Sequence, residues 1–304
     1  MLRAHTHRSL QSRLQYGRLA LLVLGLASAL LCLAAGPGFA AGQSTPKPQD
    51  GGGSARERLL VFSKTAGFRH QSIPDGIKAI REILGARYEI DASEDAAVFS
   101  AENLRRYRAV VFLSTTGDIL NDEQQRAFEA FIRAGGGYAG VHAAADTEHT
   151  WPWYGDLVGA YFKTHPEIQP ATIKVEDRTH RSTRMLPAEW RRTDEWYVYN
   201  LTPRDRVKVL ASLDDSTIKG ATMNGDHPIA WYHEFQGGRS WYTGGGHTSE
   251  SFSEELFRKH LEGGILWAAG AAEEAPGVPN DASNGPAAKD EAPPRATPVP
   301  ESAG

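Results

Sequence analysis

Short apolar runs alternate with helix-patterned segments in the first half of the chain, and this alternation constrains the fold most. Residues 109–113 (Ala-Val-Val-Phe-Leu) are apolar throughout, and 59–62 and 138–141 are shorter strand candidates of the same kind. Strands that are apolar at every position are typical of parallel sheets covered by helices on both faces. The sequence therefore predicts an α/β fold with a doubly wound, mostly parallel sheet of flavodoxin-like type.

Helical spacing and capping residues place the segments between these strands. Apolar residues at Ile73, Ile77, Ile80 and Leu84 predict a helix over 73–84. Asn121 is a favourable N-cap, so a second helix is expected from there to residue 133. A further short strand is expected at 87–91.

The second half of the chain has the pattern of an added β-rich segment within the same single domain. Strands are expected at 172–176, 196–200, 207–212, 229–235 and 240–243. Residues 236–238 (Gln-Gly-Gly) predict a hairpin turn between the last two. A final helix is expected over roughly residues 253–267.

The first forty residues have the organisation of a secretory signal peptide. Residues 1–18 carry four arginines and no acid, 19–35 are an uncharged run rich in Leu and Ala, and small residues follow at 38–40. This order predicts a signal over 1–40 and an exported protein, periplasmic or extracellular. The alternative is a retained membrane anchor, for which the apolar run is short.

Composition divides the rest of the chain into a domain and two flanking segments. Residues 41–55 are mainly Gly, Ser, Pro and Gln, which indicates a flexible linker. Residues 271–304 hold seven of the seventeen prolines, with Ala, Glu and Asp, and are expected to be a disordered tail. The domain is therefore expected at 56–270.

Cys32 is the only cysteine, and it lies inside the expected signal. Cleavage would leave no disulfide, thiol nucleophile or cysteine-ligated metal in the mature protein. A lipoprotein interpretation is set aside because Leu31 stands where a small residue is expected. The net charge of −4 becomes more acidic once the signal arginines are removed, which does not suggest nucleic acid as a partner.

Polar residues follow several of the predicted strands, and ligands of open α/β sheets bind at such strand ends. The sharpest signal is His142, which follows three glycines and a strand and precedes Ala143 and Ala144. This is the pattern of an elbow, a tight turn that pushes one side chain outward between small neighbours. Imidazole can serve as acid, base or metal ligand. The alternative is a structural histidine in a glycine-rich loop.

With these motifs in place, the chain resembles the ThuA-like, trehalose-utilisation family, a branch of the class I glutamine-amidotransferase-like fold. The matching segments are 67–70 (Gly-Phe-Arg-His), 135–142, 165–166 (His-Pro), 194–197 (Asp-Glu-Trp-Tyr), Trp231 and 238–247. Amidotransferase relatives carry a cysteine nucleophile at the elbow, so His142 excludes glutamine hydrolysis through a thioester. One departure is Gly245, where relatives often have an apolar residue, and a looser loop is expected there.

The resemblance implies a role in disaccharide metabolism, including trehalose and 3-keto sugars. We expect an exported sugar-active enzyme, a hydrolase, lyase or isomerase, with His142, Glu195 and His247 as catalytic residues and no required cofactor. A histidine and a carboxylate can move protons beside a carbonyl or a glycosidic oxygen. Asp194 and Glu195 precede a predicted strand, so one is expected to face the cleft while the other caps a turn.

Two alternatives stay open. The first is a non-catalytic sugar-binding module, suggested by the aromatic residues of the second half. The second is a metal-dependent hydrolase, because three histidines and a carboxylate can bind a divalent ion. The expected ligand set is His142, His165, Glu195 and His247, although its spacing is dispersed and has no His-Glu-x-x-His signature.

Further residues are expected to bind a small-molecule sugar. Trp151 and Trp153 lie in a predicted loop after the elbow and are expected to form a pocket wall, with Tyr197 and Trp231 as additional flat faces. The alternative for each aromatic is core packing. The remaining candidates are His70, Thr116, Asp118 and His165. Structural or surface roles are expected for His149, His180, His227, His233 and His260.

Overall fold

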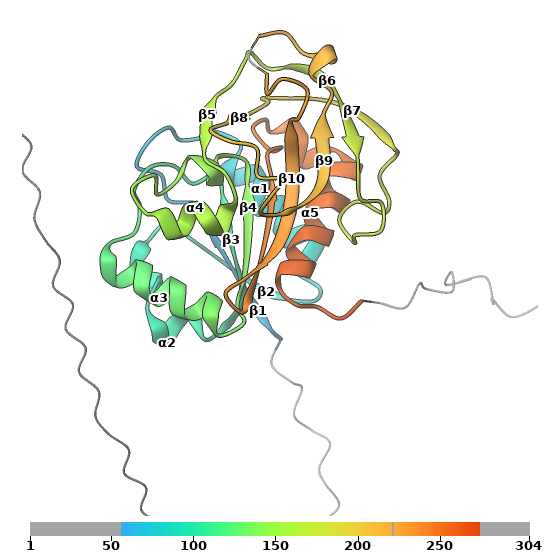
Figure 1. Cartoon of the computed structure of the whole chain (residues 1–304). Coiled ribbons are helices and arrows are strands. Elements are labelled where there is room, and N and C mark those ends of the chain that lie inside the picture. Colours follow the sequence, from blue (N-terminus) through green and yellow to red (C-terminus); the bar gives the residue numbers. More distant parts are fainter. Residues whose placement is uncertain (1–55, 221, 274–304) are drawn as a thin grey trace, which may run out of the picture. The chain divides into compact units, whose positions relative to one another are not determined.

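The computed structural model describes residues 56–220 and 222–273 (Figure 1). The predicted signal at 1–40, the linker at 41–55 and the tail beyond residue 273 lie outside the described residues. Among the helices of the described part, none is long and apolar enough to cross a membrane.

A nine-stranded sheet forms the centre of the domain, in the order β2-β1-β3-β4-β11-β10-β9-β6-β7. The strands β2, β1, β3, β4 and β11 pair in parallel, and β10, β9, β6 and β7 continue the sheet with antiparallel pairing. Their bounds are β1 Arg58–Phe62, β2 Glu89–Ser93, β3 Tyr107–Leu113, β4 Gly137–Val141, β6 Gln169–Val175, β7 Glu189–Asp194, β9 Lys208–Leu213, β10 Pro228–Phe235 and β11 Gly238–Thr243. The predicted fold class, with its added β-rich second half, is confirmed.

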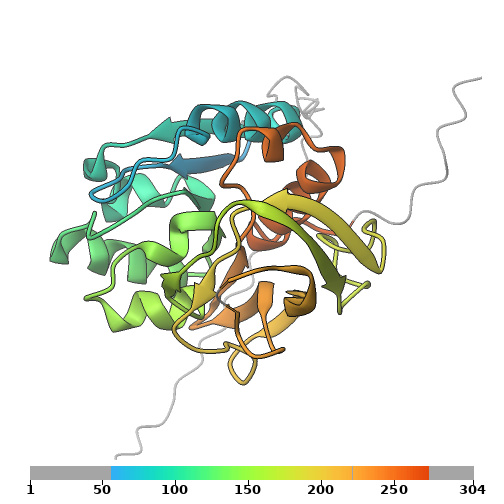
Figure 2. The ribbon, with the colours of Figure 1, turned by 90° about the horizontal axis from the view of Figure 1, so that it is seen from above.

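Helices cover both faces of the parallel half of the sheet, as Figures 1 and 2 show. One face carries α1 and α5, which contact each other, and the other carries α2, α3 and α4. The bounds are α1 Ile73–Leu84, α2 Ala101–Leu104, α3 Asp122–Arg133, α4 Pro152–Val158 and α5 Glu255–Ala268. Asn121 and Gln124 form a capping box at the start of α3, as the N-cap residue predicts.

Aromatic side chains fill the interface between the sheet and α3. Phe112 of β3 stacks on Phe128 of α3 with ring centroids 5.3 Å apart, and Phe62 of β1 meets Phe99 edge-on at 4.6 Å. All four side chains are buried. The strands β3 and β4 are buried along almost their whole length, which explains why they lack polar alternation.

Some elements differ from the sequence prediction. The expected strand 196–200 is reduced to β8 Val198–Tyr199, which pairs with β5 Phe162–Thr164 in a separate two-stranded sheet. The strand β7 was not predicted because two of its three buried positions are Arg192 and Asp194, so its alternation is not hydrophobic. The helix α4 lies where a loop was expected, and Pro152 occupies its first turn, where proline is well tolerated.

A buried histidine fixes α5 against the sheet. His260 is fully buried; its Nδ1 donates to the carbonyl oxygen of Ser182 at 2.8 Å, and its Nε2 lies 3.2 Å from the hydroxyl of Thr243. Burial lowers the pKa of His260 to about 4. The neutral ring therefore suits this site, and a protonated ring does not.

This histidine makes stability pH-dependent in a stated direction. Between pH 6.5 and 4 the unfolded chain binds a proton at His260 that the folded chain does not, so the free energy of unfolding falls as the pH is lowered. The slope from one such group approaches about 1.4 kcal/mol per pH unit. We predict that His260→Gln has a shallower dependence of the free energy of unfolding on pH between pH 6.5 and 4. The slope, measured by urea unfolding at a series of pH values, is expected to fall by up to about 1.4 kcal/mol per pH unit. An identical slope in the variant and the wild type would contradict the prediction.

Candidate active site

Loops that follow strands running in the same direction surround a cavity of about 320 Å³. The strands β1, β4, β11 and β7 all end at this edge of the sheet, and each is followed by residues that line the cavity or lie directly beneath it. The lining residues are Phe68, His70, Asp146, Phe162, His165, Glu195, Tyr197 and His247. The strand-end location expected for the site is therefore where the cavity lies.

His142 has the backbone of an elbow. Its φ is +51°, in the left-handed region that residues other than glycine seldom adopt, and Ala143, Ala144 and Ala145 follow it in a short 3-10 helix. The expected outward orientation is corrected, because the side chain is fully buried. Its ring lies beneath Tyr197 and His70, with ring centroids 4.3 and 4.8 Å away.

The hydrogen bonds of His142 define which nitrogen faces Glu195 and His247. Nδ1 lies 2.9 Å from the carbonyl oxygen of Gly244, which can only accept, so Nδ1 carries the proton. In the neutral ring, Nε2 then presents a lone pair toward Nδ1 of His247 at 3.1 Å and Oε2 of Glu195 at 3.4 Å. This backbone bond is the kind that orients metal-bound or catalytic histidines.

Glu195 is the central acceptor of the cluster. Oε2 lies 3.1 Å from Nδ1 of His247, and Oε1 lies 3.2 Å from Nδ1 of His165. Burial raises the pKa of Glu195, but hydrogen bonds and attraction from His142 and His247 outweigh it and hold the pKa well below its ordinary value. Burial lowers the pKa of His247, and the hydrogen bond and attraction of Glu195 reverse this to a raised pKa. The site therefore holds a carboxylate at neutral pH.

His70 completes the cluster from the loop after β1. Burial, followed by repulsion from His142 and His247, lowers the pKa of His70 to about 3. Its Nδ1 is buried without a hydrogen-bond partner in the structure, an arrangement that costs stability unless a ligand occupies it. A neutral imidazole with an unused nitrogen is a suitable metal ligand.

A set of four side chains has the geometry to hold a metal ion. One ligand atom each from His70, His142, Glu195 and His247 lies within 4.8 Å of the others. The set expected from sequence differs at one position, since His70 takes the place of His165. His165 is partly exposed at the cavity mouth and reaches only the outer oxygen of Glu195.

Asp194 holds the loop that carries His247. Its carboxylate accepts hydrogen bonds from the backbone N–H groups of Gly246 at 2.8 Å and His247 at 3.1 Å. It also pairs with Arg192 at 2.7 Å, and both side chains are buried. The two adjacent carboxylates thus point in different directions, as the alternation of side chains along an extended chain suggests. Glu195 lies in the cluster and Asp194 is bonded to a turn. Gly245 is closely packed in this loop, because an added Cβ there would meet Nη1 of Arg192 at 2.7 Å.

Of the remaining residues predicted to bind the sugar, some line the cavity and others lie away from it. Tyr197 lines the cavity, whereas Thr116 lies behind it and bonds to the loop of His70. Asp118 is on the rim of a different, open depression and accepts from Thr150.

The tryptophans do not form the expected pocket wall. Trp151 is buried at the start of α4 and stacks on Trp153 with ring centroids 5.0 Å apart. Trp231 is fully buried and donates to the carbonyl oxygen of Val158. Core packing, the alternative considered from sequence, describes all three positions, because Trp151 and Trp231 are buried in the core and Trp153 packs against it.

Three cavity residues were missed from sequence: Phe68, Asp146 and Phe162. Phe68 lies within the matching segment 67–70, two residues before His70, but a lone phenylalanine carries no chemical signal. Asp146 stands four residues after the elbow, at the end of its short helix, and its position was a usable clue. Phe162 lies in the short strand β5, which sequence patterns did not reveal.

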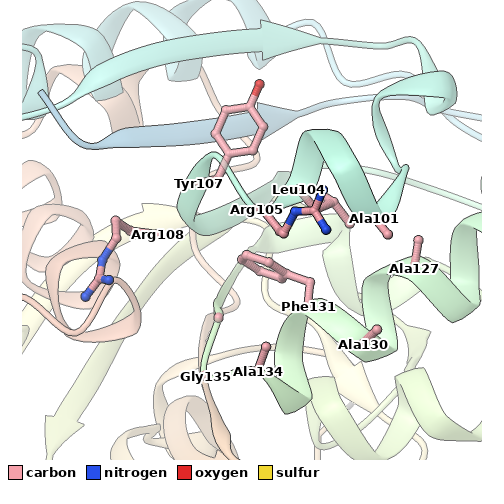
Figure 3. A pocket seen from close by; sticks show the side chains of 11 residues that line it. Ala101, Leu104, Arg105, Tyr107, Arg108, Ala127, Ala130, Phe131, Ala134 and Gly135 are labelled. Atoms are coloured by element: carbon pink, nitrogen blue, oxygen red, sulfur yellow. The ribbon is translucent and has the colours of Figure 1, made fainter. Parts of the chain in front are cut away.

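A larger cavity of about 510 Å³ lies at the opposite edge of the sheet, between α2 and α3 (Figure 3). Small and apolar residues such as Leu104, Ala130 and Phe131 form most of its lining, and Arg105 and Arg108 are its charged members. Among the described residues, its lining contains no histidine and no carboxylate, whereas the smaller cavity is lined by both.

The sheet order, the elbow and the strand-end cluster define an α/β domain of the class I glutamine-amidotransferase-like fold with histidine at the elbow. The family model for trehalose utilisation, ThuA, matches residues 58–268, and the chain belongs to this family.

Solved structures agree with this assignment. A ThuA-like protein from Bacteroides uniformis is 24% identical, with a TM-score of 0.61 over 72% of this chain and 94% of that one. A ThuA-like protein from Parabacteroides merdae is 20% identical, with a TM-score of 0.60 over 70% of this chain and 90% of that one. At these identities the likeness establishes the fold. No curated protein sequence matches the chain.

Asp194 is predicted to be a positioning residue on which the site loop depends. Asp194→Ala leaves the buried Arg192 without its buried partner and frees three backbone N–H groups, so we predict a loss of about 3–5 kcal/mol in the free energy of unfolding. Glu254→Ala is the matched control, because Glu254 pairs with the same arginine from a partly exposed position and its loss is expected to cost under about 1 kcal/mol. Equal losses in the two variants, measured by urea unfolding, would refute this role.

Proposed function

We propose that the chain is a metal-dependent enzyme that acts on sugars. The observation that carries the proposal is the convergence of four ligand atoms from His70, His142, Glu195 and His247 within 4.8 Å. Membership of the trehalose-utilisation family supports a role in sugar metabolism.

The spacing of the inner atoms suits a divalent ion. Nε2 of His142, Nδ1 of His247 and Oε2 of Glu195 are separated by 3.1, 3.4 and 3.1 Å. Ligand atoms of a tetrahedral zinc site with bonds of about 2.0–2.1 Å lie about 3.3–3.5 Å apart. Three imidazoles and one carboxylate form a donor set that favours zinc or a similar ion.

The charges of the cluster also favour a cation. With Nδ1 of His142 donating to Gly244, the lone pair of its Nε2 faces the Glu195 carboxylate. Two acceptors this close require a positive centre between them, either a proton or a metal ion. The position of His70 favours the metal, because a ring nitrogen of His70 belongs to the group of four ligand atoms and a single proton shared by His142 and Glu195 would leave it without a role.

A bound divalent ion would polarise a carbonyl or acidify a water molecule at the cavity floor. Side chains at the mouth of the cavity would then donate and accept protons. His165 presents its Nδ1 toward Glu195 and the carbonyl oxygen of Pro166, which leaves Nε2 for a general base or acid. Asp146 is a second partly exposed acceptor in the same cavity.

We propose a hydrolase, lyase or isomerase reaction on a disaccharide such as trehalose or on a 3-keto sugar, carried out outside the cytoplasm. The basic, apolar and small-residue order of residues 1–40 supports export. His142, Glu195 and His247 hold the reacting centre in this proposal.

A metal-free acid/base enzyme is the second candidate. It is favoured by the His247–Glu195 contact, in which the raised pKa of the imidazole and the lowered pKa of the carboxyl stabilise an ion pair. Metal content separates the two candidates directly.

We predict one divalent ion per chain, measured by elemental mass spectrometry, in protein purified without chelators. His142→Ala is expected to lose the ion, with an effect on affinity beyond the ~10–100-fold typical of outer-shell changes. Removing the ion with a chelator is expected to abolish turnover of trehalose or 3-keto-trehalose, and returning it is expected to restore turnover.

His233→Gln is the matched control, because His233 is a partly buried histidine remote from the cluster that bonds to the carbonyl oxygen of Leu157. It is expected to retain both the ion and turnover. Full turnover by metal-free protein would overturn the metal-dependent mechanism in favour of the acid/base candidate. Unchanged turnover in His142→Ala would overturn both.

A further inference from the structure

Phe68 is the most exposed of the large apolar side chains in the described part of the chain. Its exposed fraction is 66%, and it lines the same cavity as His70 and Glu195. Its ring stands edge-on against His70, with ring centroids 4.9 Å apart. An exposed aromatic side chain beside a polar cluster indicates a surface that becomes covered by a ligand.

The backbone around Phe68 is held in place despite this exposure. The hydroxyl of Thr116 donates to the carbonyl oxygen of Phe68 at 2.9 Å and accepts from the N–H of Gly67 at 3.2 Å. The N–H of Ala66 donates to the carbonyl oxygen of Thr116 at 2.8 Å. The ring is therefore presented by a fixed turn, which lowers the entropy lost when a ligand binds.

Phe162 supplies a second aromatic wall from another part of the chain. It packs on Tyr197 at 4.2 Å and on His165 at 5.8 Å, whereas Phe68 contacts His70. The two phenylalanines thus border different sides of the histidine cluster. Flat apolar faces beside polar groups suit a pyranose ring, which has apolar C–H faces and hydroxyl groups at its edge.

The charges of the cavity restrict which sugars fit. Asp146 and Glu195 are its acidic members, and its described lining contains no lysine or arginine. The neighbouring Arg69 is paired with Glu94 at 2.7 Å. A phosphate or carboxylate group on the sugar would meet no lysine or arginine in this lining, and His165 and His247 already face the carboxylate of Glu195.

We propose that Phe68 and Phe162 form a sugar subsite that binds one pyranose ring of an uncharged glycoside next to the histidine cluster. This subsite rests on the sugar specificity of the proposed function, but it does not depend on the metal or on the reaction. Asp146 accepts hydrogen bonds from the hydroxyl groups of the ring, and the neighbouring part of the glycoside lies over Glu195 and His247.

Calorimetric titration of the full-length protein with trehalose tests the subsite by binding alone. Loss of a phenylalanine ring that a ligand covers is expected to weaken affinity about tenfold or more, so Phe68→Ala is predicted to raise Kd by that factor. Phe68→Trp is expected to bind within about threefold of wild type, because it restores a flat face. Trehalose 6-phosphate is expected to bind at least about tenfold more weakly than trehalose.

Ile168→Ala is the matched control, since Ile168 is the other exposed large apolar residue and does not line the cavity. It is expected to bind trehalose like the wild type. Equal affinity of Phe68→Ala and wild type, tighter binding of the phosphorylated sugar, or no binding of trehalose by the wild type would each overturn the subsite.

Metal content measured on the same samples separates this result from the proposed function. If the protein contains a stoichiometric ion but does not bind sugar, the subsite is contradicted and the proposed metal site stands. If metal-free protein binds sugar in a way that depends on Phe68 but shows no turnover, the proposed enzymatic function is contradicted and the subsite stands.

Discussion

The site depends on one buried carboxylate, Asp194, that joins the end of β7 to the loop after β11. Its oxygens accept the backbone N–H groups of Gly246 and His247 and pair with Arg192. The next residue, Glu195, contacts the imidazole of His247 itself. Two adjacent residues therefore fix the loop after β11. Asp194 holds the backbone of this loop, and Glu195 holds the side chain of His247. This arrangement brings residues that are more than fifty positions apart into hydrogen-bonding distance.

The second constraint is the strained elbow at His142. A positive φ at a histidine is unfavourable, and the surrounding alanines and the bond from Nδ1 to Gly244 hold it in place. Amidotransferase relatives place a cysteine nucleophile at this position of the fold, and a buried imidazole changes what it can do. At this elbow the lone pair of Nε2 of His142 faces the carboxylate of Glu195 and the imidazole of His247. The space between these three groups suits a bound cation and does not suit an attacking nucleophile.

Sequence patterns predicted the parallel half of the fold well, because β1, β3 and β4 contain the apolar runs 59–62, 109–113 and 138–141, and α1 and α3 have helical spacing or a clear cap. They failed at β7, where the inward positions Arg192 and Asp194 are charged and are satisfied only by partners far along the chain. Strand ends and family motifs singled out His142, Glu195 and His247, and the structure brings these three side chains into contact. The tryptophans were misplaced because residue type does not distinguish a sugar-binding face from a core aromatic. Phe68 and Phe162 were missed because their position in the lining depends on the shape of the cavity, which no local pattern encodes.

Anomalous diffraction at a zinc absorption edge tests the central claim most directly, because it locates the ion instead of inferring it from activity. The account predicts one strong peak at bonding distance, about 2.0–2.2 Å, from Nε2 of His142, Nδ1 of His247 and a carboxylate oxygen of Glu195, with His70 as the fourth protein ligand. Crystals of zinc-supplemented protein that show no peak at this position, with Nε2 of His142 hydrogen-bonded to Glu195, would contradict it.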